Sequence, residues 1–137
     1  MKKLLCSLFA LSAVSTAMAQ EVNIKLLGTS DIHGRVVPWS YGADVEDKSG
    51  SYAQIATYVK DVRKNNKNVV LVDVGDAIQD NQVDVFAKDK KYYKDHPIPK
   101  VLNEMKYDIF VLGNHEFNFG MKALDEILKD IKAKKLT

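Results

Sequence analysis

Cysteine is almost absent from this sequence, which contains a single one, Cys6, among 137 residues. Cys6 lies in an apolar N-terminal segment, whereas a lipoprotein would place its cysteine at the site of leader cleavage. The rest of the chain has no cysteine, which excludes disulfide bonds and thiolate chemistry there. The lack of thiolate ligands also argues against iron–sulfur and Cu(I) sites, which favour sulfur.

Long apolar runs are lacking beyond the first twenty residues. Lys2 and Lys3 precede a mostly apolar stretch at 4–14, and residues 17–19 (Ala-Met-Ala) have the small-x-small pattern of a signal-peptidase site. The apolar stretch is shorter than the roughly 20 residues that a membrane-spanning helix needs. Residues 1–19 therefore read as a signal peptide. This predicts an exported protein, periplasmic or secreted, with no transmembrane segment in the mature chain.

An excess of one charge is also missing. The sequence has 20 lysines and arginines against 18 acidic residues, and the surplus is Lys2 and Lys3 of the leader. The mature chain is therefore balanced, and no binding of a nucleic-acid polymer is inferred. The segment 88–97 mixes lysines and tyrosines with aspartates, which favours a solvated loop, and His96 within it is given no role.

What the sequence does contain is a strand pattern followed by a helical pattern, three times over. Such alternation predicts an α/β fold with a largely parallel sheet. The closing "IKAKKLT" shows no further strand, so the chain looks as if it stops within a domain. The expected strands are 22–28, 68–75 and 107–113, and the expected helices are 51–66, 98–106 and 121–131.

The three helices are expected from apolar residues that recur at helical spacing. Pro97 and Pro99 suit the entry to the second helix. The residues expected on the buried faces are Tyr52, Ile55, Ala56, Val59 and Val62; Ile98, Val101, Leu102 and Met105; and Met121, Leu124, Ile127, Leu128 and Ile131.

Polar clusters follow each of the three expected strands. They read "GTSDIHG" after the first, "DVGDAIQ" after the second and "GNHEFN" after the third. In an open parallel sheet, ligands bind outside the carboxyl ends of the strands. The clusters are therefore expected to converge on one edge, although they lie about forty residues apart along the chain.

The residue types in these clusters suit metal ions. Asp31 and His33 can turn an oxygen and a nitrogen toward one point, Asp76 adds a carboxylate able to bridge two cations, and Asn114 adds a neutral oxygen. Mixed oxygen and nitrogen ligation indicates Zn²⁺, Mn²⁺ or a similar ion. Two such ions about 3.5–4 Å apart can hold a phosphoryl group and activate water, and His115 could protonate the leaving oxygen.

Turn and cap chemistry is the alternative for each of these polar residues taken singly. Glu116 is interpreted in that way, as a cap or a solvent-facing residue. Phe117 and Phe119 are expected to pack in the core beneath the third cluster. Asp73, inside the second strand, is expected to be structural rather than a ligand.

Three motif blocks carry a family resemblance. "LLGTSDIHGR", "VLVDVGDAIQ" and "LGNHEFNFG" resemble the first three blocks of the calcineurin-like metallophosphoesterases. They are most similar to the secreted branch of 5′-nucleotidases and 2′,3′-cyclic-nucleotide 2′-phosphodiesterase/3′-nucleotidases. The resemblance implies a layered α/β sandwich, incomplete here because only the first three βα units are present. Residues 20–137 would be the N-terminal part of such a catalytic domain.

The resemblance also implies roles for individual residues. Asp31, His33 and Asp76 would hold one divalent metal ion, with Asp76 bridging to a second ion bound by Asn114. His115 would contact the phosphate and assist the leaving group, and Asn114 would also face the substrate. The substrate would be a nucleotide or another small phosphoester.

The sequence departs from the family in three respects. Later histidine ligands and a base-binding C-terminal domain do not occur in this chain. Asn118 stands where many 5′-nucleotidases have aspartate, which shifts the expectation toward the cyclic-phosphodiesterase branch. Asp80 stands where glycine is common. Two alternatives therefore stay open: a truncated, non-catalytic fragment, or a phosphoesterase or pyrophosphatase acting on nucleotide sugars or other phosphoesters.

Overall fold

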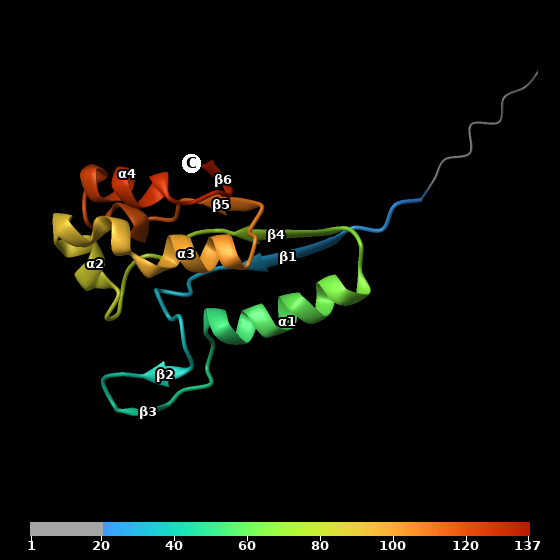
Figure 1. The fold of residues 1–137 in the computed structure, drawn as a ribbon, viewed down its shortest axis with the longest axis horizontal. Coiled ribbons are helices and arrows are strands. Elements are labelled where there is room, and N and C mark those ends of the chain that lie inside the picture. Colours follow the sequence, from blue (N-terminus) through green and yellow to red (C-terminus); the bar gives the residue numbers. More distant parts are fainter. Residues whose placement is uncertain (1–20) are drawn as a thin grey trace, which may run out of the picture.

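A computed structural model describes residues 21–137 of the protein (Figure 1). The expected leader, residues 1–19, and Gln20 after it lie outside the described residues. Within residues 21–137, no helix has the length and apolar character needed to cross a bilayer. The residues that lead into the first strand extend away from the body of the protein, where Val22 and Ile24 are exposed.

A four-stranded parallel sheet forms the centre of the fold. Its strands, in their order across the sheet, are β1 (Lys25–Thr29), β4 (Val69–Asp73), β5 (Ile109–Val111) and β6 (Lys134–Leu136). Leu27 of β1 lies opposite Leu71 of β4, and Asp73 of β4 lies opposite Phe110 of β5. This parallel α/β arrangement confirms the predicted fold class.

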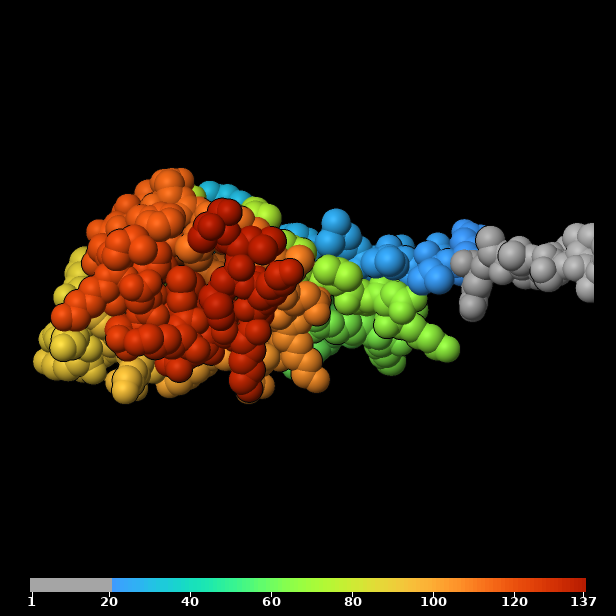
Figure 2. Space-filling view, turned by 90° about the horizontal axis from the view of Figure 1, so that it is seen from above, coloured from blue at the N-terminus to red at the C-terminus, as the bar shows by residue number. Residues whose placement is uncertain are grey.

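The fourth strand, β6, corrects the expectation that no strand follows the last helix. It pairs in parallel with β5, with Val111 opposite Leu136. Its residues are all exposed, so it carries no hydrophobic pattern that the sequence could reveal. Lysines are common on edge strands because they discourage further pairing. Figure 2 shows this C-terminal region in red, over the body of the protein.

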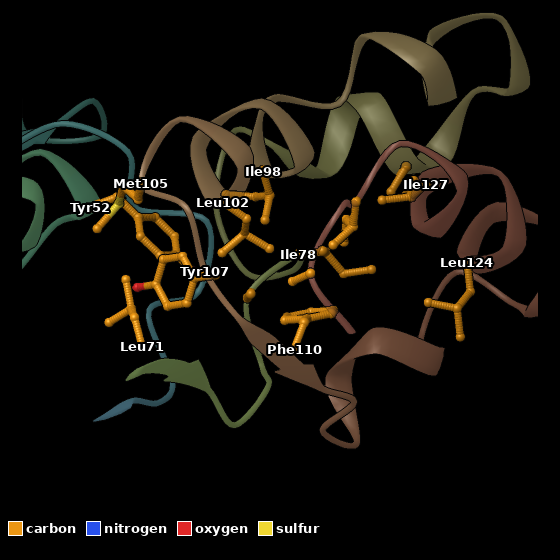
Figure 3. Close-up of a cluster of buried hydrophobic side chains, with 14 of the residues drawn as sticks. Tyr52, Leu71, Ile78, Ile98, Leu102, Met105, Tyr107, Phe110, Leu124 and Ile127 are labelled. Carbon is orange, nitrogen blue, oxygen red and sulfur yellow. The ribbon is translucent and has the colours of Figure 1, made fainter. Parts of the chain in front are cut away.

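Three helices follow the strands as the apolar spacing predicted: α1 (Tyr52–Asn65), α3 (Pro97–Glu104) and α4 (Met121–Lys129). The hydroxyl of Ser51 caps α1 by accepting a hydrogen bond from the backbone N–H of Gln54. Figure 3 shows how the helices pack on the sheet face that carries Leu71 and Phe110. Met121 is the exception to the predicted faces, because it is exposed at the start of α4.

Two connections contain elements that the sequence pattern did not predict. The connection between β1 and α1 holds a short antiparallel hairpin, β2 (Trp39–Ser40) with β3 (Val45–Glu46). The connection between β4 and α3 holds α2 (Asp84–Lys88) and a 3₁₀ helix, η1 (Lys90–Asp95).

His96 is not a residue of a solvated loop, as the sequence suggested, because its side chain is buried. Its Nδ1 atom accepts a hydrogen bond from the backbone N–H of Ile98, so the ring caps the start of α3. Its ring also meets Phe86 edge to face. Burial lowers the pKa of His96 to about 4. The lysines and aspartates of η1 around it are mostly exposed, as expected.

Candidate metal centre

Three loops carry the polar clusters at the carboxyl edge of the sheet: the β1 loop (residues 30–38), the β4 loop (74–83) and the β5 loop (112–120). The first two continue the pairing of their strands beyond the sheet. The backbone N–H groups of Asp31 and His33 donate to the carbonyl oxygens of Gly75 and Asp76, at 3.1 and 2.9 Å. The predicted convergence of the clusters therefore begins with main-chain hydrogen bonds.

Asp31, His33 and Asp76 all adopt the left-handed backbone conformation, with φ of 55°, 49° and 57°. For a residue with a side chain this conformation costs about 1–2 kcal/mol. Strain of this kind persists where the surrounding structure over-determines it, and it clusters at functional sites. The inter-loop hydrogen bonds provide that constraint and aim the three side chains to one side.

The β4 and β5 loops touch backbone to backbone through two glycines. A Cβ atom on Gly75 would collide with the main chain of Gly113, and one on Gly113 would collide with Asp76. Gly75 also has a φ of 101°, in the region that favours glycine. Both glycines are therefore needed to bring Asp76 against the third cluster.

Asp31, His33 and Asp76 form a group able to hold a cation, here called the carboxylate–histidine group. One ligand atom from each lies within 4.8 Å of the others. His33 Nε2 lies 3.9 Å from Asp31 Oδ1. Asp31 is exposed and the other two are half-buried, so the group opens to solvent. These are three of the residues predicted from the sequence, brought together from two loops.

The β5 loop places His115, another predicted residue, beside this group. The backbone N–H of His115 donates a hydrogen bond of 2.8 Å to Asp76 Oδ1. The other carboxylate oxygen of Asp76, Oδ2, does not take part in this hydrogen bond. The rings of His115 and His33 meet edge to face, with centroids 5.3 Å apart. Asn114 is exposed and precedes the 3₁₀ helix η2 (His115–Phe117), whose N-terminus its side chain does not cap.

Glu116 is the residue that sequence reasoning misread. Its side chain is fully buried rather than solvent-facing, and it caps no helix of its own. Its carboxylate accepts four backbone hydrogen bonds, at 2.7, 2.8, 2.7 and 3.3 Å, from Gly113, Asp76, Ala77 and Ile78. Glu116 therefore fastens the β4 loop to the β5 loop. The available signal was the run of consecutive N–H donors after β4, which needs an acceptor.

Asp73, the last residue of β4, is buried, as expected for a structural residue. Its carboxylate accepts hydrogen bonds from the hydroxyls of Thr29 and Tyr52, at 2.7 and 3.2 Å, and from the backbone N–H of Gly75. Tyr107 Oη lies 2.9 Å from the same threonine hydroxyl. Burial raises the pKa of Asp73. It also raises the pKa of Tyr52 well above its usual value and the pKa of Tyr107 to about 12.

The two phenylalanines of the β5 loop behave differently from each other. Phe119 packs partly buried against the core, which confirms the prediction for it. Phe117 is 44% exposed, so the expected core packing is wrong for that residue. The 3₁₀ turn of η2 directs Glu116 inward and its neighbour Phe117 outward.

A cavity of about 800 Å³ borders the carboxylate–histidine group. Its walls come from the β1 loop, the β2–β3 hairpin and the β4 loop, and they include Trp39 and Tyr41. A site for small molecules commonly has a volume of this order.

The sequence of residues 24–135 matches the calcineurin-like phosphoesterase family. The chain belongs to this family. It is 40% identical, over 81% of its length, to the trifunctional nucleotide phosphoesterase protein YfkN of Bacillus subtilis. It is 35% identical, over 92% of its length, to the 2′,3′-cyclic-nucleotide 2′-phosphodiesterase/3′-nucleotidase of Haemophilus influenzae. The crystal structure of YfkN matches 82% of the chain with a TM-score of 0.75 and 37% identity.

This calcineurin-like phosphoesterase chain spans only part of those relatives. It covers 8% of the length of YfkN and 20% of the Haemophilus influenzae enzyme. It covers 36% of the chain in the YfkN crystal structure. Within that span, the predicted resemblance and the predicted α/β phosphoesterase fold are both confirmed.

The structure explains one of the departures of this calcineurin-like phosphoesterase from its family. Asp80 has a φ of 96°, a backbone conformation that glycine adopts without strain. Its backbone N–H donates to Asp84 Oδ1 at 2.8 Å, which holds the turn in place before α2. A glycine, which the family resemblance leads one to expect here, would adopt this backbone conformation without strain.

Proposed function

We propose that the protein to which this chain belongs is an exported, metal-dependent hydrolase of nucleotide phosphoesters. Residues 20–137 would form the N-terminal part of its catalytic domain, behind a signal peptide at 1–19. The observation that carries the proposal is the carboxylate–histidine group, whose ligand atoms lie within 4.8 Å of one another at the carboxyl edge of a parallel sheet. Membership of the calcineurin-like phosphoesterases supports the reaction class.

The donor atoms suit divalent ions of the Zn²⁺ or Mn²⁺ kind, because carboxylate and imidazole ligands are mixed without sulfur. Asp31, His33 and Asp76 would hold one ion, and Asn114 would hold a second that shares Asp76. Asp76 is well suited to sharing because one of its oxygens accepts from the His115 backbone and its other oxygen does not. When bound, such ions neutralise phosphoryl charge and lower the pKa of a water molecule.

His115 would supply the proton that the leaving oxygen needs. Asp76 holds its backbone, Asn118 contacts its ring nitrogen Nδ1 at 2.9 Å, and the ring lies beside that of His33. These contacts fix the ring at the border of the carboxylate–histidine group. The rest of the substrate would extend from the group toward solvent or the adjoining cavity.

Nucleotides are the proposed substrates because of the relatives. The proteins named above are described as a nucleotide phosphoesterase and a cyclic-nucleotide phosphodiesterase/3′-nucleotidase. A human 5′-nucleotidase is 33% identical over 91% of this chain, so identity does not separate the two branches widely. The amide of Asn118, in place of the aspartate of many 5′-nucleotidases, favours the cyclic-phosphodiesterase branch.

The test is Asp76→Asn in the full-length protein. Asparagine keeps an oxygen that can accept from the His115 backbone, so the loops stay joined while the bridging charge is removed. We expect both turnover and the second metal ion to be lost. Asp61→Asn, on the exposed side of α1, is the matched control and should retain both.

The assays are metal analysis and phosphate release from 5′-, 3′- and 2′,3′-cyclic nucleotides with Mn²⁺, Zn²⁺ or Mg²⁺. Unchanged metal stoichiometry in Asp76→Asn would remove Asp76 from the site. A wild-type protein that binds metal but hydrolyses none of these nucleotides would refute the proposed substrate class.

A further inference from the structure

Gln79, in the β4 loop, is linked to both histidines of the site. Its backbone carbonyl oxygen lies 3.2 Å from Nδ1 of His33. Its side-chain Oε1 accepts a hydrogen bond of 3.1 Å from Nδ2 of Asn118, and the same Nδ2 lies 2.9 Å from Nδ1 of His115. One residue therefore has a path to a ring nitrogen of each histidine.

The contact to His33 fixes where that ring carries its proton. A carbonyl oxygen can only accept a hydrogen bond, so Nδ1 of His33 must be the donor. The neutral ring then has a bare Nε2, which lies 3.9 Å from Asp31 Oδ1, on the side of the carboxylate–histidine group. Neutral histidine in water favours the proton on Nε2, so this state of His33 depends on the carbonyl of Gln79.

The contact to His115 has the opposite sense. Nδ2 of Asn118 carries two hydrogens. One is directed to Oε1 of Gln79, and the other is directed to Nδ1 of His115. Nδ1 of His115 is then an acceptor, and its neutral ring carries the proton on Nε2. A carboxylate at position 118 would do the reverse, because it would accept a hydrogen bond from an Nδ1–H group.

An asparagine amide can turn either its oxygen or its nitrogen toward a neighbour, so a second contact is needed to fix its orientation. Asn118 is exposed, and Oε1 of Gln79 is the acceptor that directs its nitrogen into this path. We propose that Gln79 is a positioning residue that holds His33 and His115 in opposite tautomers, His33 through its backbone and His115 through its side chain and Asn118.

The catalytic meaning of this arrangement rests on the proposed function. His33 presents a lone pair on Nε2, as a metal ligand requires. Its Nδ1–H donates to a backbone carbonyl oxygen, which is a common arrangement for the other ring nitrogen of a metal-binding histidine. His115 presents an Nε2–H, as a proton donor to a leaving oxygen requires. The tautomers themselves do not depend on that function, so they can be tested in the absence of metal or substrate.

The experiment is a long-range ¹H–¹⁵N spectrum of the ¹⁵N-labelled, metal-free chain at about pH 8, which lies above the reference pKa of histidine, about 6.5. We expect the Nδ1–H form for His33 and the Nε2–H form for His115. His96 is an internal reference, because its Nδ1 accepts from the backbone of Ile98 and its proton must lie on Nε2. An Nδ1–H form of His115 would mean that both amides are reversed, and would overturn the proposal.

Two substitutions at position 79 separate the two paths. Gln79→Leu removes Oε1 but keeps the backbone carbonyl, so Asn118 can turn its amide oxygen toward Nδ1 of His115. The Nδ1–H form of His115 should then gain population, while the nitrogen shifts of His33 stay unchanged. Gln79→Glu keeps an acceptor for Asn118 and should leave both histidines as in the wild type. Gln82→Leu, an exposed glutamine of the same loop, is the matched control and should change neither.

A third substitution tests the amide directly. Asn118→Asp places an obligate acceptor next to His115, so its ring should change to the Nδ1–H form with His33 unaltered. A Gln79→Leu spectrum identical to the wild type at His115 would show that Gln79 does not set the tautomer. Failure to bind metal or to hydrolyse nucleotides would leave these spectra unchanged, so the two proposals fail separately.

Discussion

Glu116 offers the sharpest test of how the candidate site is held together. Its buried carboxylate receives two N–H groups on each oxygen: Ala77 and Ile78 on Oε1, Asp76 and Gly113 on Oε2. Glu116→Gln preserves size and shape but replaces one oxygen with an NH₂ group. Whichever oxygen is replaced, two backbone donors then face another donor.

The expected cost follows from those two lost bonds. A hydrogen bond to a charged group contributes about 1.5–3 kcal/mol. Losing two gives a destabilisation of about 3–6 kcal/mol, a large part of the roughly 5–15 kcal/mol that stabilises a typical domain. For a domain of this size, the melting temperature should fall by on the order of 10–20 °C.

Thermal and urea unfolding of the chain without its leader measure this change. Glu104→Gln is the matched control, because Glu104 is exposed at the end of α3. Its melting temperature should equal that of the wild type. Glu116→Asp keeps the charge but withdraws it by one methylene group, so its loss should fall between the two.

A second readout connects the stability change to the site. Because Glu116 joins the β4 loop to the β5 loop, Glu116→Gln should weaken metal binding at Asp76 and Asn114 even below its unfolding temperature. A Glu116→Gln protein with wild-type stability would show that the four N–H groups find other partners. The role of Glu116 as the fastening between the loops would then be refuted.

Two further predictions concern acid stability and activity. Burial holds the pKa of His96 at about 4 in the folded protein, against 6.5 unfolded, so the unfolded chain binds a proton first as the pH falls. The contribution of the neutral His96 ring to the free energy of unfolding is complete above about pH 6.5 and falls by up to about 3 kcal/mol toward pH 4. Urea titrations at several pH values measure this fall, and in His96→Gln the free energy of unfolding should decrease less on acidification. Residues 20–137 alone, with excess Mn²⁺, should release no phosphate from 5′-AMP or 2′,3′-cyclic AMP above a metal-only control, because four protein ligands hold two ions weakly. Turnover that disappears in His115→Ala would contradict this.

The sequence by itself determined the layout of the fold and the location of the site. Apolar residues spaced three and four apart predicted the buried faces of α1, α3 and α4, and runs of β-branched residues predicted the positions of the central strands. Parallel strands end at a common edge, so the clusters around Asp31, Asp76 and His115 had to converge there. The carboxylate–histidine group is the outcome of that topology.

The tertiary structure decided what periodicity does not encode. Glu116 and His96 look like surface residues in the sequence, yet both are buried, because the groups that bond or enclose them come from other segments. Strand β6 has no apolar pattern and exists because β5 offers it an edge for pairing. The link from Gln79 to both histidines depends on three loops meeting. A polar side chain is buried only where partners distant in sequence satisfy its hydrogen bonds, and those partners are fixed by the folded chain.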